Sequence, residues 1–153
     1  MSAQPPRGPS IPPVYLIAAL VVMALLHYLF PVMILWAEPW RYAGVAVIAV
    51  ALGFGFWAVL LFNKAETGVV PFTPIMAFIA GGPYRAMRNP MYLAMVGLLL
   101  GTGVLFGSAT PFAVIPVFIA LIQWRFILAE EAMLAAQFGE TYAEYKARVR
   151  RWL

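Results

Sequence analysis

Long runs without a charged side chain are the feature that most limits what this chain can fold into. Residues 14–36, 42–62 and 89–124 contain no Asp, Glu, Lys or Arg. A helix needs about 20 apolar residues to cross a bilayer, so each of the first two runs is long enough for one crossing. The third run would measure about 54 Å as a single helix, and Gly and Pro at residues 107–111 divide it in two. The sequence therefore predicts an all-α, multi-pass membrane protein with four transmembrane helices.

The composition supports this class of protein. The chain is 64% hydrophobic and 10% charged, whereas a soluble domain carries about 25% charged residues. The proline-rich residues 1–13 are expected to be a disordered lead rather than a signal peptide, followed by one membrane domain at 14–153. The expected spans are almost free of charge and cover about residues 14–36, 40–62, 90–107 and 111–129, the last two as a short helical hairpin.

The distribution of cations predicts the orientation. With four spans, both termini and the central loop lie on one side, which holds all the Lys and Arg residues except Arg41 and the boundary residue Arg125. The positive-inside rule places that side, with both termini, in the cytoplasm. The net charge of +4 then reflects topology and contact with membrane lipids, and no nucleic-acid partner is expected. The chain has no Cys, which excludes disulfides and thiolate metal sites, and no metal site is predicted.

Two arginines precede the expected start of the third span. Asn89 is a good N-cap residue and Pro90 suits the first turn of a helix. Free N–H groups at a helix start, with Arg85 and Arg88 close by, are suited to a carboxylate or phosphate. The simpler interpretation, which the local features favour, is that both arginines contact lipid phosphates.

The fourth span is expected to end at adjacent carboxylates. Glu130 and Glu131 either form ion pairs at the membrane boundary with Arg125 or hold a cation. After Gly139, an expected helix end, residues 140–150 are predicted to form an amphipathic cytosolic helix. Its aromatic stripe, which includes Tyr142 and Tyr145, is typical of an interfacial helix but also suits a pocket for a flat ring or a cation.

Together these motifs form a longer pattern. Gly-Pro-Tyr-Arg-x-x-Arg-Asn-Pro-Met-Tyr occupies residues 82–92. After two short spans, residues 130–152 read Glu-Glu-x-x-Leu-x-x-x-Phe-Gly-x-x-Tyr-x-x-Tyr-x-x-x-Val-x-Arg-Trp. This pattern resembles the isoprenylcysteine carboxyl methyltransferase family and is similar to the related phospholipid N-methyltransferases. The resemblance covers about residues 67–152, while the first two spans match only in hydropathy.

The resemblance implies a membrane methyltransferase that uses S-adenosylmethionine and releases S-adenosylhomocysteine. It implies a cytosol-facing cofactor pocket and a lipophilic acceptor that enters from the bilayer, in the cell membrane of a prokaryote. Arg88, Asn89 and Glu130 are the implied catalytic residues, although well-known members have His where this chain has Asn89, which cannot act as a base near neutral pH. The implied cofactor-binding residues are Tyr84, Arg88, Asn89, Pro90, Tyr92, Glu130, Glu131, Tyr142 and Tyr145.

Within this assignment, Glu130 or Glu131 is expected to bind the ammonium group of the cofactor. Arg88 and the helix start at residues 89–92 are expected to receive its carboxylate, and Tyr142 and Tyr145 to flank the adenine or close the pocket. These roles follow from the resemblance together with the charges of the groups involved.

Three alternatives remain at this point. The acceptor is either an isoprenylcysteine-like carboxylate or another lipid group, including a phospholipid amine. A small multidrug transporter would need an acidic residue within a span, whereas Glu38 and Glu66 flank the spans. A non-catalytic membrane scaffold is the third possibility, and the intact Arg88, Tyr92 and glutamate pair argue against it.

Overall fold

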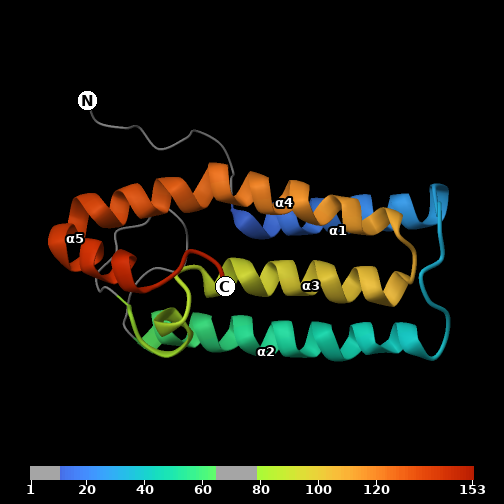
Figure 1. Cartoon of the computed structure of the whole chain (residues 1–153), viewed down its shortest axis with the longest axis horizontal. Coiled ribbons are helices and arrows are strands. Elements are labelled where there is room, and N and C mark those ends of the chain that lie inside the picture. Colours follow the sequence, from blue (N-terminus) through green and yellow to red (C-terminus); the bar gives the residue numbers. More distant parts are fainter. Residues whose placement is uncertain (1–10, 65–78) are drawn as a thin grey trace.

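The computed structural model describes residues 11–64 and 79–153, and every regular secondary-structure element in these ranges is a helix (Figure 1). The predicted lead therefore lies mostly outside the described residues, as does Glu66, whereas Pro12 opens the first helix. The α-helices are α1 (Pro12–Leu29), α2 (Ala43–Lys64), α3 (Pro90–Phe106), α4 (Val114–Ile122) and α5 (Leu128–Arg148). The short turns are the 3₁₀ helices η1 (Trp40–Tyr42), η2 (Gly82–Arg85) and η3 (Thr110–Ala113), and the π-helical η4 (Gln123–Ile127).

Among the described residues, three helices are long and apolar enough to cross a membrane. They are Pro12–Leu29, Trp40–Lys64 and the continuous helix Thr110–Arg148. The shorter α3 is also apolar, and its 17 residues correspond to about 26 Å, at the lower limit for a crossing. The all-helical prediction is confirmed, and the protein is an integral membrane protein.

Two helix boundaries differ from the prediction. The first helix ends at Leu29 and not near residue 36, because Pro31 disfavours a helical conformation at Phe30. The fourth helix does not end at residue 129, because η4 and α5 continue it without a break. Gly139 has a φ of 51° and lets the chain reverse, so the end of α5 returns towards the bundle (Figure 1). This second part of α5 stops at Arg148.

The helices form a narrow bundle in which α3 lies between α2 and the α1–α4 pair (Figure 1). Small residues bring α2 and α3 close together: a Cβ on Gly101 would lie 2.7 Å from Ile48 Cγ1, and one on Gly97 would lie 2.9 Å from Ala51 Cβ. Such contacts are common where membrane helices pack. On the other side of α3, a buried cluster that includes Met23, Leu99 and Phe126 joins it to α1, α4 and η4.

At the end of the bundle farthest from α5, an extended segment crosses the turn between α3 and α4. We call this segment, residues 30–39, the strap. Leu35 N donates to Gly107 O over 2.8 Å, and Ala109 N donates to Met33 O over 2.9 Å. Trp36 Nε1 also donates to Val104 O over 2.7 Å. The strap therefore satisfies carbonyl groups that the end of α3 would otherwise leave without a partner.

Candidate active site

The opposite end of the bundle gathers the predicted site residues. There η2 and the start of α3 face the start of α5, the returning part of α5 and the last residues of the chain (Figure 1). We call this the site end, and we call residues 149–153 the tail. Hydrogen bonds and ion pairs link these segments, as the following paragraphs describe. Segments far apart in the sequence thus meet at one place.

Asn89 and Pro90 start α3 as expected, but the Asn89 side chain does not cap the helix. Its Nδ2 instead donates to Arg151 O over 3.0 Å. The Asn89 carbonyl still accepts the first helical hydrogen bond, from Leu93 N at 3.0 Å. The predicted side-chain cap is therefore wrong, because the amide makes a long-range bond to the tail in place of the local one.

Tyr92 lies in the first turn of α3, and its hydroxyl donates to Glu130 Oε1 over 2.7 Å. Both side chains are at least half buried. Glu130 follows the fourth apolar segment, and burial raises the pKa of its carboxyl while the hydrogen bond from Tyr92 lowers it. Because these effects oppose each other, the Tyr92 hydroxyl is the group that favours the ionised form of Glu130 here.

Glu131, the next residue, has a different environment. Arg151 donates to both of its oxygens, from Nε over 3.0 Å and from Nη2 over 2.8 Å. Arg88 Nη2 lies 3.4 Å from Glu131 Oε1. Burial alone would raise the pKa of Glu131, but the hydrogen bonds from Arg151 and the charge of Arg88 outweigh burial and hold that pKa below its usual range. The net pKa of Glu130 is raised, whereas that of Glu131 is lowered. Adjacent carboxyl groups whose pKa values are shifted in opposite directions often mark functional sites.

The tail completes the site end. Arg150 O accepts a hydrogen bond of 2.8 Å from Arg88 N, and Trp152 Nε1 donates to Gln123 Oε1 over 3.0 Å. The sequence reasoning assigned no role to Arg151, Trp152 or Gln123. Arg151 and Trp152 could have been identified from the sequence, because they are the Arg-Trp pair at the end of the family-like pattern.

Besides Tyr92, the tyrosines Tyr84, Tyr142 and Tyr145 are buried at the site end. Tyr142 and Tyr145 lie on the returning part of α5, with ring centroids 6.2 Å apart, and are 2% and 6% exposed. Tyr145 donates its hydroxyl to Tyr84 O over 2.6 Å, and burial raises the pKa of Tyr145 to about 12. Burial also raises the pKa of Tyr84, so all three side chains are neutral at physiological pH.

Some buried polar atoms at the site end have no partner among the described residues. They are Arg88 Nε, Arg88 Nη1 and the Tyr84 hydroxyl. The Arg88 side chain is only 9% exposed. Leaving a buried donor without a partner costs about 1–3 kcal/mol, and more for a charged group. Such atoms therefore indicate a place where a ligand with acceptor oxygens would be stabilised.

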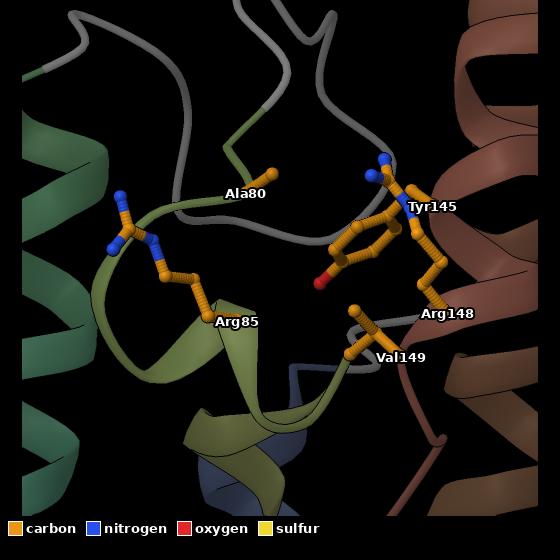
Figure 2. A pocket seen from close by; sticks show the side chains of 5 residues that line it. All are labelled: Ala80, Arg85, Tyr145, Arg148 and Val149. Atoms are coloured by element: carbon orange, nitrogen blue, oxygen red, sulfur yellow. The ribbon is translucent and has the colours of Figure 1, made fainter.

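A cavity of about 340 Å³ at the site end is lined by Ala80, Arg85, Tyr145, Arg148 and Val149; of the predicted site residues, Tyr145 is in this lining. Figure 2 shows Tyr145 and Arg148 on one side of the cavity and Arg85 on the other, with the Arg85 guanidinium directed away from the Tyr145 ring. Both charged groups in the lining are cations, so the cavity favours an anionic group. In the described parts of the chain, no three His, Asp or Glu residues are placed to hold a metal ion.

Comparison with known proteins identifies the family. The model of the phospholipid methyltransferase family matches residues 40–141, which is more than half of the chain. The chain belongs to the phospholipid methyltransferase family. The predicted resemblance is thus confirmed, and the family places the protein among membrane methyltransferases. The matched region contains Arg85, Arg88, Glu130 and Glu131, and it ends just before Tyr142.

The chain is also similar to an uncharacterized protein of Haemophilus influenzae. The two are 36% identical over 63 residues, which are 41% of this chain and 100% of that protein.

Proposed function

We propose that the protein transfers a methyl group from S-adenosylmethionine to a lipophilic acceptor at the cytoplasmic face of the membrane. The observation that carries this proposal is the buried Arg88, whose Nε and Nη1 have no partner among the described residues, at the same end of the bundle as the Glu130 carboxylate. A cation and a carboxylate at one site match the two charges of an amino acid. S-adenosylmethionine carries such an amino acid.

The contacts of the glutamates separate their roles. Both oxygens of Glu131 already accept hydrogen bonds from Arg151, so a further cation there would add positive charge to a group that is already balanced. Glu130 has the neutral Tyr92 hydroxyl as its partner. We therefore assign the ammonium of the cofactor to Glu130 and its carboxylate to Arg88. Tyr142 and Tyr145 flank the adenine or close the pocket, the role that the family resemblance implies for them.

When bound, the cofactor supplies a methyl group on a positively charged sulfur, which is already activated for displacement. The residues of this chain then need to align the reactants and exclude water rather than to supply a strong base. The buried tyrosines and the docked tail suit the exclusion of water. Asn89 holds the tail through Arg151 O and orients the start of α3, and no proton is assigned to it.

The membrane arrangement follows from the helices and their charges. We propose that α3 crosses the bilayer with the three longer helices, so that the site end and both termini face the cytoplasm. Arg85, Arg88, Lys146 and Arg148 lie at the site end, and Arg41 at the other, as the positive-inside rule requires. The acceptor reaches the site laterally from the lipid phase.

The lining of the cavity supports an acceptor with an anionic headgroup. Arg85 and Arg148 in the lining suit a phosphate or a carboxylate, because guanidinium groups bind both strongly. A phospholipid amine fits this requirement through its phosphate and agrees with the family match. An isoprenylcysteine fits through its carboxylate and is the second acceptor to test.

The test is a methyl-transfer assay on the purified protein in nanodiscs, with S-adenosylmethionine labelled in its methyl group. The discs contain either phosphatidylethanolamine or an added isoprenylcysteine, and the label in the extracted lipid is counted. We expect transfer to one acceptor, and a loss on the order of tenfold to a hundredfold in Glu130→Gln. Glu140→Gln, at an exposed position on the same helix, is the matched control and should keep full activity. Unchanged turnover in Glu130→Gln would contradict the assigned site.

A further inference from the structure

We propose that Arg151 is a positioning residue that keeps Glu131 away from Arg88, so that Arg88 stays available to the carboxylate of the cofactor. This inference rests on the proposed function. It assigns a role to a tail residue that lies outside the region matched by the family.

The first argument is the balance of charge. Arg88, Arg151 and Glu131 form one cluster with two positive charges and one negative charge, so the cluster has a surplus of one positive charge. A buried surplus cation is costly unless an anion joins it. The buried nitrogen atoms of this cluster that lack a partner are on Arg88, whereas the Arg151 side chain is 30% exposed, so the geometry places the missing anion at Arg88.

The second argument is the division of Glu131 between its two partners. Arg151 makes two hydrogen bonds of 3.0 and 2.8 Å to the carboxylate, which is the paired geometry that guanidinium groups favour. Arg88 makes one contact of 3.4 Å with the Glu131 carboxylate. Arg151 thus occupies the carboxylate so fully that Arg88 retains unused donors. Without the Arg151 fork, we expect Glu131 to turn towards Arg88 and form the same paired bond with it.

The third argument is that the tail has other attachments. Arg88 N donates to Arg150 O, Asn89 donates to Arg151 O, and Trp152 donates to Gln123. The first two bonds use the backbone of the tail and the third uses a different side chain. Shortening the Arg151 side chain therefore removes the fork while the tail keeps its other contacts.

The experiment measures binding and not turnover. Calorimetric titrations in nanodiscs compare S-adenosylhomocysteine with its decarboxylated analogue, 5′-deoxy-5′-(3-aminopropylthio)adenosine, which lacks the carboxylate that Arg88 would bind. Arg151→Gln should weaken S-adenosylhomocysteine about tenfold or more and change the affinity for the analogue by less than about twofold. The double variant Glu131→Gln/Arg151→Gln should recover most of the lost affinity, because the competing carboxylate is gone.

Two further variants complete the design. Arg150→Gln is the matched control, because the Arg150 side chain is exposed and only its carbonyl contacts Arg88; it should bind both ligands like the wild type. If Arg151→Gln does not fold, as judged by thermal unfolding, Arg151→Lys replaces it. Lys keeps the charge but loses the paired geometry, and we expect a smaller loss that is again specific for S-adenosylhomocysteine.

The outcomes separate this inference from the proposed function. If the wild type binds and the double variant is as weak as Arg151→Gln, Arg151 has a purely structural role and the inference is wrong. Equal losses for both ligands, or tighter binding by Arg151→Gln, would also overturn it while leaving the cofactor site intact. If the wild type binds neither ligand, the proposed function fails and this inference fails with it.

Discussion

The two ends of the bundle are built alike but differ in how they treat buried polar groups. At each end a non-helical segment crosses the helix termini and is tied to them by backbone hydrogen bonds. At the strap end, Trp36 Nε1 donates to Val104 O and Arg41 Nε donates to Leu105 O over 3.0 Å. The fully buried Ser108 hydroxyl is bonded to His27 Nδ1 at 2.8 Å. The buried polar groups named here at the strap end are thus paired with one another within the protein.

The site end, in contrast, contains buried polar atoms that have no hydrogen-bond partner among the described residues. Arg88 is buried with two nitrogen atoms that have no partner among the described residues, and so is the Tyr84 hydroxyl. The described part of the strap end leaves no buried side-chain nitrogen or oxygen in this state. Since such atoms destabilise a protein on its own, their presence at one end and not at the other indicates where a ligand completes the structure.

The largest expected effect is that of Arg88→Gln. This change removes the buried charge assigned to the cofactor's carboxylate, and we expect the affinity for S-adenosylhomocysteine to fall on the order of a hundredfold. Arg41→Gln removes a partly buried arginine from the other end and should leave the affinity unchanged. Calorimetric titration of both variants checks the contrast, and a comparable loss in Arg41→Gln would contradict it.

A substitution at the strap end should lower the stability of the protein without changing its affinity for S-adenosylhomocysteine. Gly107 has a φ of 74°, and a Cβ there would lie 2.6 Å from Trp36 O. Gly107→Ala therefore adds backbone strain and a clash that displaces the strap, and we expect it to lower the stability of the protein by about 2 kcal/mol. Thermal unfolding in detergent measures this loss, while binding of S-adenosylhomocysteine to the folded fraction should stay the same. Weakened binding would mean that the two ends are coupled.

The smallest expected effect concerns pH. Burial raises the pKa of Glu130 and the Tyr92 hydrogen bond lowers it, so Tyr92→Phe should raise that pKa further. Binding of the cofactor's ammonium needs the ionised carboxylate; it is present above the pKa of Glu130 and is lost as the pH falls through that value. Titrations from neutral to acidic pH should show the loss at a higher pH in Tyr92→Phe than in the wild type. If the wild type and Tyr92→Phe lose binding at the same pH, Glu130 does not bind the ammonium of the cofactor.

The elements that follow from local sequence signals could be predicted well. Pro90 opens α3 and positive φ values occur at Gly107 and Gly139, because Pro and Gly act on their own backbone. The strap was not foreseen. An apolar run does not show where a helix gives way to an extended segment, and the bonds that hold the strap come from the end of α3, about 70 residues away in the sequence.

The candidate site could be predicted as a set of residues but not as a set of contacts. The family-like pattern indicated Arg88, Tyr92 and both glutamates together. It could not show that Glu131 is already occupied, because the arginine that occupies it belongs to the tail and reaches it only after Gly139 reverses the chain. For the same reason Asn89 was expected to cap its own helix, whereas it bonds the tail. Such pairings depend on tertiary structure and leave no local signal.

Hydrogen–deuterium exchange of the protein in nanodiscs, with and without S-adenosylhomocysteine, tests the central claim most directly. The account predicts slower exchange in peptides from residues 82–92 and 140–152, because the ligand completes the polar cluster at the site end. Peptides from the strap and from residues 104–110 should exchange at an unchanged rate. Protection at the strap end alone, or no change anywhere at saturating ligand, would contradict the claim that the site end is built to hold the cofactor.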